Sequence, residues 1–266
     1  MKKWFFVLVI LSLLVSNQAS AQSRHGLYQF SQPGSKSIVL TGIGPAFLFG
    51  DLGGNVQSGI LKDFDVELAK IMFTLSYRYV FPNNIGLNVF GLYNEFVHSD
   101  ANSRNAVRGY DSKVNLAIIG THIEYNFIGG EYAQFYTPHT LYVFAGLGVL
   151  FSLNTLNSTN PTIPLYLNKL GKVITESNST DNLTATFAKT RTISPVLPIG
   201  VGYDYAISDQ ISLGAEYTIN LPFSDYIDGI SPSGSKSADY LMSLNLTLTY
   251  KFSNMPNANR RRVIWN

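Results

Sequence analysis

Apolar and polar residues alternate one by one along much of this chain, a pattern typical of β-strands whose two faces meet different surroundings. Between Phe73 and Arg78, for example, the order is Phe-Thr-Leu-Ser-Tyr-Arg. Segments of this kind predict eight strands, at residues 37–50, 67–81, 85–98, 112–127, 140–154, 192–208, 210–222 and 238–252. The sequence therefore predicts an all-β protein.

The first 21 residues have the pattern of a secretory signal peptide. Lys2 and Lys3 precede an apolar stretch at 4–15, and Ala-Ser-Ala at 19–21 is a small-residue cleavage site. We predict that the mature chain begins at Gln22. The chain has no cysteine, so neither a thiol-linked lipid anchor nor a disulfide can form. Removing the two lysines lowers the formal net charge from +2 to 0, so no global basic field would attract nucleic acid.

Two environments could explain the alternation. A soluble barrel or sandwich would bury the apolar faces, whereas a membrane barrel would turn them towards lipid. Three features favour lipid: Tyr and Phe gather at strand ends as in an aromatic girdle, a narrow eight-stranded interior cannot hold so many rings, and short and long connections alternate. Beyond the signal peptide, no run of the ~18 apolar residues needed for a spanning helix occurs. We therefore expect an antiparallel up-and-down transmembrane β-barrel of about eight strands, surrounded by outer-membrane lipid.

The connections predict which end faces out, because such barrels have short periplasmic turns and long external loops. Connections 82–84 and 208–210 are tight, whereas 51–66, 99–111, 155–191 and 223–237 are long. Segment 155–191 is rich in Asn, Ser and Thr, which predicts an external loop rather than a buried element. Connection 128–139 is long for a periplasmic turn. We expect a periplasmic segment at 22–36, the barrel at 37–252 and a periplasmic tail at 253–266.

Charged residues on the polar strand faces would share the narrow lumen. They are Lys70, Arg78, His122, Glu124, Asp204, Glu216 and Lys251. A histidine with a carboxylate partner can transfer protons, but enclosed charges also need partners simply to offset desolvation. No nucleophile and base stand together in the sequence, and the four histidines lack metal-ligand spacing. We therefore interpret the set as a structural charge network and expect no enzymatic activity, no metal and no cofactor.

Several segments together resemble the Bacteroidetes outer-membrane β-barrel family that includes PorG of the type IX secretion system. They are residues 50–53, 122–126, 142–149, 197–203 and 225–231, in the family's order. Asp51, Asp225, Tyr226 and Asp228 match family positions. Asn220 and Gly229 depart from it, since the family tends to have Arg and Asp there. The resemblance implies an outer-membrane scaffold that contacts periplasmic proteins of a secretion apparatus.

The predicted C-terminal tail suggests a hypothesis for function. Arg260, Arg261 and Arg262 form a basic cluster in the predicted tail and are candidates for binding an acidic protein surface. A solvated, disordered tail would show the same composition. The alternative function is a small passive outer-membrane channel, although about eight strands leave an interior that side chains just fill.

Overall fold

The computed structural model describes residues 36–50, 69–81, 84–101, 106–107, 109–129, 138–158, 160, 164–167, 173–174, 183–208, 210–230 and 239–252. The predicted signal peptide, the segment 22–35 and the tail 253–266 lie outside these ranges, as do Asp51 and Arg260–Arg262. In the part of the chain that is described, no helix is long and apolar enough to cross a membrane.

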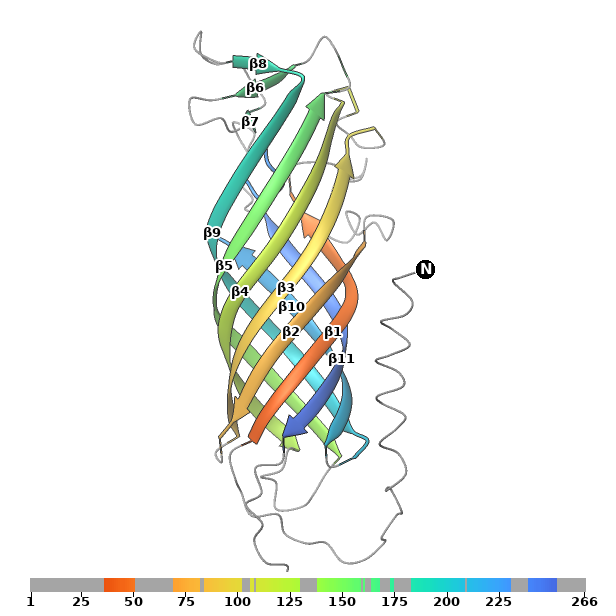
Figure 1. Cartoon of the computed structure of the whole chain (residues 1–266), viewed down its shortest axis with the longest axis vertical. Helices are drawn as coiled ribbons and strands as arrows, with labels where there is room; N and C mark the ends of the chain where they lie inside the picture. The colour runs from red at the N-terminus through yellow and green to blue at the C-terminus, as the bar shows by residue number, and fades with distance from the viewer. Residues whose placement is uncertain are drawn as a thin grey trace, which may run out of the picture. The chain divides into compact units, whose positions relative to one another are not determined.

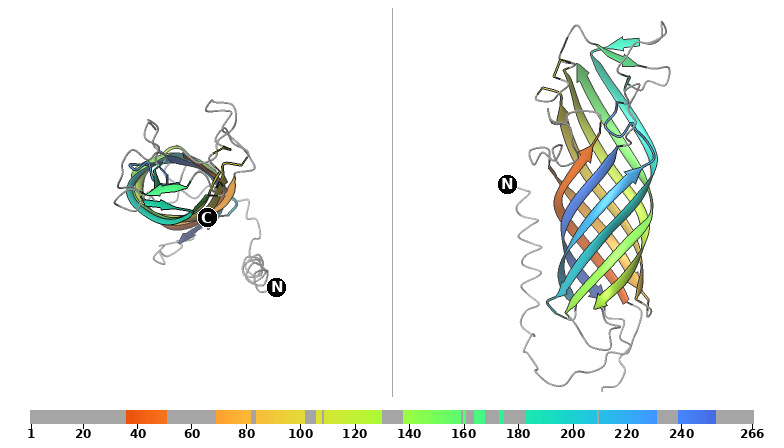
Figure 2. Two further views of the ribbon diagram at one scale, coloured as in Figure 1. Left: turned by 90° about the horizontal axis from the view of Figure 1, so that it is seen from above. Right: turned by 180° about the vertical axis from the view of Figure 1, so that it is seen from behind.

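Eight strands form one closed antiparallel barrel, in the order β1-β11-β10-β9-β5-β4-β3-β2 (Figure 1, Figure 2). The strands are β1 (Lys36–Phe49), β2 (Lys70–Val80), β3 (Ile85–Ser99), β4 (Tyr110–Gly129), β5 (His139–Ser158), β9 (Phe187–Ala206), β10 (Ile211–Pro222) and β11 (Tyr240–Phe252). Strands adjacent in sequence are adjacent in the wall, and β1 closes the barrel against β11. The predicted fold and all eight predicted strands are confirmed.

The predicted loop at 155–191 is wrong in part. β5 continues to Ser158 and β9 begins at Phe187, so both strands extend well into the segment. Between them, β6 (Leu165–Leu167), β7 (Val173–Ile174) and β8 (Leu183–Ala185) form a small antiparallel sheet. Leu165 and Val173 are fully buried and share an apolar cluster with Tyr110. A few apolar side chains thus give this mostly polar segment a packed element, against the expectation of an exposed loop.

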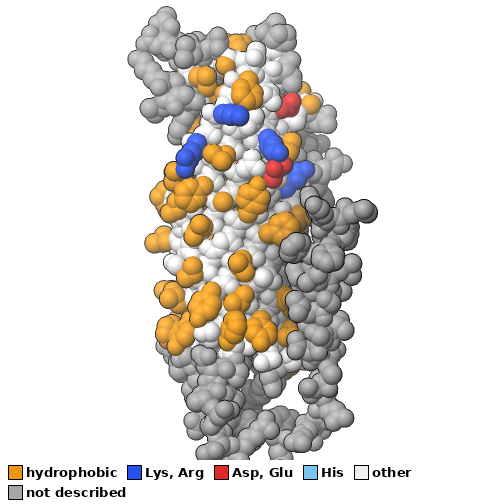
Figure 3. Space-filling view, in the orientation of Figure 1, with side chains coloured by type: hydrophobic (Ala, Val, Ile, Leu, Met, Phe, Trp, Pro, Cys, Tyr) orange, Lys and Arg blue, Asp and Glu red, His pale blue; other side chains and the backbone are white. Residues whose placement is uncertain are grey.

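The apolar face of each strand points outward. On β2, Phe73, Leu75 and Tyr77 are exposed, whereas the alternating Arg78 is only 3% exposed. Figure 3 shows hydrophobic side chains spread over the visible face of the barrel, with Lys and Arg gathered towards the upper end. Exposed aromatic side chains stand near the short-turn ends of the strands, at Tyr125, Tyr203, Tyr205, Tyr250 and Phe252. This is the exterior that contact with lipid requires.

Leu246 lies outward on β11 and is 70% exposed, a few residues above the aromatic Tyr250. We predict that Leu246→Arg lowers the free energy of unfolding in vesicles by about 2–4 kcal/mol, because a cation would be placed within hydrocarbon. The matched control is Val107→Arg, at a 79% exposed position between β3 and β4, which should change little. Reversible urea titrations in lipid vesicles measure both. Equal stabilities for the two variants would contradict a lipid-facing β11.

Candidate functional site in the barrel lumen

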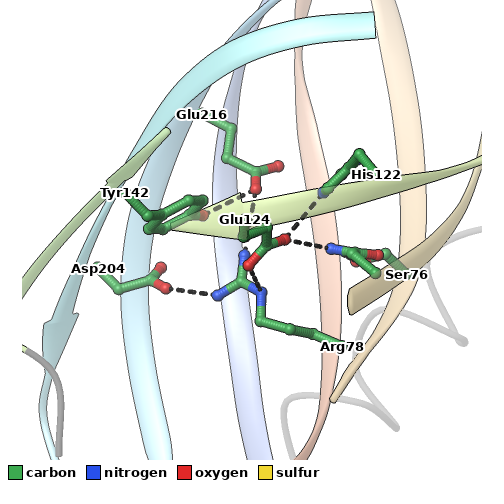
Figure 4. Close-up of polar contacts among 8 residues, drawn as sticks. Ser76, Arg78, His122, Glu124, Tyr142, Asp204 and Glu216 are labelled. Carbon is green, nitrogen blue, oxygen red and sulfur yellow. Dashed lines mark hydrogen bonds and ion pairs between the residues drawn. The ribbon is translucent and has the colours of Figure 1, made fainter. Parts of the chain in front are cut away.

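Arg78 is the centre of a buried polar network inside the barrel (Figure 4). Its guanidinium reaches three carboxylates on three other strands. Nε lies 2.6 Å from Glu124 Oε2 on β4, Nη1 lies 3.2 Å from Asp204 Oδ2 on β9, and Nη2 lies 3.4 Å from Glu216 Oε1 on β10. One side chain of β2 therefore joins strands from around the whole wall, and the planar fork of arginine suits contact with several carboxylates.

Histidine, amide and phenol side chains complete the network. His122 Nε2 lies 2.8 Å from Glu124 Oε1, and the Asn88 amide donates to the same oxygen at 2.8 Å. The Tyr142 hydroxyl donates to Glu216 Oε1 at 2.7 Å, and its ring lies 4.4 Å from Arg78 Cζ. Each buried carboxylate thus has more than one donor or a cation beside it, which offsets its desolvation.

Gly202 makes room for the Tyr142 ring. A Cβ at this β9 position would stand 2.2 Å from Tyr142 Cζ, so a side chain would displace the tyrosine. Alternation along β5 points Tyr142 inward. A small residue on one strand and a large one on its neighbour therefore place the hydroxyl at Glu216.

The network contains five of the seven residues predicted to share the lumen: four are joined by ion pairs, and His122 by its contact with Glu124. Lys70 begins β2, at the long-loop end of the barrel. Lys251 is half-buried near the end of β11. Ile38 of β1 lies opposite Lys251 in the pairing with β11 and opposite Arg78 in the pairing with β2. Asn88 and Tyr142 belong to the network but were not expected. Strand periodicity marks both as inward, but their partners depend on which strands meet across the lumen.

Apolar side chains occupy part of the lumen as well. The cluster comprises Ala46, Leu48, Met72, Leu92, Phe96, Val114, Leu116, Ile118, Leu150, Val196, Ile227 and Leu241. The sequence signal is a local loss of alternation, as between Leu116 and Ile119 on β4, where both faces carry apolar residues. These inward residues replace water with packed hydrocarbon.

The connection after β10 folds into the barrel mouth. Three inward hydroxyls donate to its backbone carbonyls: Ser112 to Asp228 at 3.1 Å, Ser152 to Ile227 at 2.7 Å, and Thr192 to Tyr226 at 3.0 Å. These donors come from β4, β5 and β9. We call residues 224–230 the mouth loop. Hydrogen bonds from three strands hold it as part of the interior rather than as a surface loop.

Two further features fix the mouth loop. Asp239, just before β11, accepts a hydrogen bond from the Ile227 amide at 2.7 Å. Gly229 has a φ of 95°, which disfavours any residue with a Cβ. Ile227 and Ile230 are fully buried. The family positions Asp225, Tyr226 and Asp228 therefore lie in a loop that closes the lumen, which the sequence did not reveal.

Little space remains beside the network. A cavity of ≈30 Å³ lies there, lined in part by Ser76, Asn88, His122 and Glu216. This volume is enough for about one or two water molecules. Within the described ranges, no group of three or more His, Cys, Asp or Glu side chains could hold a metal ion. The geometry of the lumen is that of a structural charge network with packed side chains around it, in which some buried polar atoms, such as His122 Nδ1 and Asp204 Oδ1, have no hydrogen-bond partner among the described residues.

A closed antiparallel wall, an apolar exterior and a filled interior define an eight-stranded outer-membrane β-barrel. The chain matches no protein-family model and no curated protein.

Several solved structures of bacterial proteins are similar to the chain. The attachment invasion locus protein Ail of Yersinia pestis is 12% identical, with 82% of this chain and 99% of that chain covered and a TM-score of 0.42. Neisserial surface protein A is 18% identical, with 82% and 99% covered and a TM-score of 0.41. A major outer membrane protein of Thermus thermophilus is 13% identical, with 82% and 100% covered and a TM-score of 0.45. Likenesses at this level transfer no function to the present chain.

Proposed function

We propose that this protein is a sealed outer-membrane scaffold of a secretion apparatus resembling the PorG-containing type IX system. The observation that carries the proposal is the filled lumen, in which Arg78 links β2 to β4, β9 and β10, and hydrogen bonds from β4, β5 and β9 hold the mouth loop. A barrel with no open passage can bind other molecules only at its rims and on its exterior. The five segments that resemble the PorG-containing family support the secretion context.

The partners would be periplasmic secretion proteins, which the short-turn end would meet. Two segments at that end are candidates, the connection 130–137 and the tail 253–266 with Arg260–Arg262. Clustered arginines favour an acidic protein surface, both for the encounter and for orientation. Neither segment is among the described residues. In the chain, the first connects β4 to β5 and the second follows β11.

Conductance separates a scaffold from a channel. We expect the folded wild-type protein to give no steady single-channel current in planar bilayers, because the network and the apolar cluster occupy the lumen. A known porin inserted in the same bilayers serves as the positive control. A large, steady conductance from the wild type would favour the passive channel instead.

Partner recovery tests the proposed role directly. We predict that Arg260→Gln, Arg261→Gln and Arg262→Gln together reduce the co-purification of periplasmic proteins after gentle detergent extraction, with barrel folding unchanged. The control exchanges Arg104 and Arg108, in the predicted external loop 99–111, for glutamine. Unchanged partner recovery and unchanged secretion in the triple variant would contradict the role given to the tail.

A further inference from the structure

The exterior of β9 changes from apolar to cationic near its long-loop end. Its outward positions run from Ile193, which is exposed, to Arg191 and Lys189, which are exposed as well. On the neighbouring β5, Leu153 pairs with Arg191 and is also exposed. The two cations, which we call the β9 cation pair, therefore stand directly beyond the apolar surface.

The height of this pair matches the headgroup region of a bilayer. Tyr203 marks the aromatic end of β9. From there to Arg191 the strand climbs about 30 Å along the barrel axis, at ~2.5 Å per residue for a strand tilted as in membrane barrels. The apolar band of such barrels is about 25 Å tall. Arg191 and Lys189 thus emerge where hydrocarbon gives way to headgroups.

Neither member of the pair has an acidic partner among the described residues. The cation on the nearby β4, Lys113, lies 2.8 Å from Glu95 and is thereby neutralised. The Lys189 ammonium lies over the ring of Phe187, at 5.8 Å from the centroid. On its other side β9 has lost its strand neighbour, because β10 ends at Pro222 opposite Val196. Two cations about 7 Å apart, with no acidic partner among the described residues, therefore lie on a part of β9 that only β5 flanks in the described wall.

We propose that the β9 cation pair binds the phosphate group of an anionic lipid in the outer leaflet, whose acyl chains lie against Ile193 and Leu153. Arginine forms paired hydrogen bonds with phosphate oxygens, and a lysine beside it adds a second charge. Acyl chains account for the exposed apolar side chains immediately below. The inference rests on the lipid-facing exterior and not on the scaffold role.

The test uses the folded full chain in micelles of a neutral detergent. Binding of dioleoylphosphatidic acid is titrated by native mass spectrometry, with dioleoylphosphatidylcholine and inorganic phosphate as separate probes. We expect the wild type to prefer phosphatidic acid. Each cation removed, in Lys189→Gln or Arg191→Gln, should weaken its binding about fivefold, and the double variant about 25-fold.

Lys113→Gln is the matched control, because it removes a cation of the same outward face that Glu95 already neutralises. It should change phosphatidic acid binding by less than about twofold. Equal losses in Lys113→Gln and in the pair variants would overturn the proposal, as would unchanged binding in the double variant. Binding of inorganic phosphate as tight as that of phosphatidic acid would overturn the lipid assignment in favour of a free anion.

Discussion

Arg78→Met should lower the free energy of unfolding by about 3–5 kcal/mol, since it leaves Glu124, Asp204 and Glu216 buried without their shared cation. Methionine keeps much of the side-chain volume, so the loss reports on charge more than on a cavity. The measurement is urea unfolding in lipid vesicles followed by circular dichroism.

A second variant separates charge pairing from packing. Arg78→Met combined with Glu124→Gln, Asp204→Asn and Glu216→Gln removes the cation and all three anions together. Replacement of a whole buried ion cluster by neutral groups is often close to neutral in stability. The quadruple variant should therefore recover most of the loss. A quadruple variant as unstable as Arg78→Met alone would contradict the interpretation that unpaired carboxylates cause the effect.

Ile227→Ala should lower the free energy of unfolding by about 2–5 kcal/mol, because a fully buried side chain of the mouth loop would leave a cavity in the luminal cluster. The amide hydrogens of Ile227 and Ile230 should also exchange faster, since the bond from Ile227 to Asp239 and the bond within the loop from Ile230 to Asp228 would both be held less firmly. Unfolding titrations and hydrogen exchange measure the two effects.

Val107→Ala is the control for the mouth loop, as Val107 lies in another connection at the same end of the barrel and is 79% exposed. It should change stability by less than about 0.5 kcal/mol. If Ile227→Ala were equally mild, with amide exchange unchanged, the mouth loop would not be an integral part of the interior.

The lumen is closed both at the Arg78 network and at the mouth loop, and this favours a scaffold over a channel. The Arg78 network joins β2, β4, β9 and β10, and the mouth loop is bonded to β4, β5 and β9. A passage for solutes would require both to move, together with the apolar cluster between the strands. A scaffold requires neither to move, and stiffness of the wall then benefits its function.

Strand positions and the choice of faces could be predicted from the sequence because both follow from a local rule. In a strand each side chain points opposite to its neighbour, and a slip of one residue would turn an entire apolar face inward. On β2, Phe73 and Leu75 had to face lipid once Arg78 faced the lumen. The same rule marked Glu124, Asp204 and Glu216 as inward.

The partners of these charges could not be predicted, because contacts across a lumen depend on barrel closure and on the stagger between strands. Arg78 meets Asp204 and Glu216 across sequence separations of 126 and 138 residues. Periodicity assigns each residue a face but no height relative to a distant strand. For that reason Tyr142 and Asn88 were missed.

The position of the mouth loop likewise could not be predicted from local sequence patterns. Its polar residues, such as Asp225 and Asp228, have the composition of an external loop, and the sequence by itself determined only that it connects two strands. Its backbone carbonyls fold inward because Ser112, Ser152 and Thr192, on three different strands, converge on them. The sequence thus determined a lipid-facing barrel with charged inward positions, whereas closure of the lumen was decided only by the tertiary structure, since it depends on contacts between strands that no local period encodes.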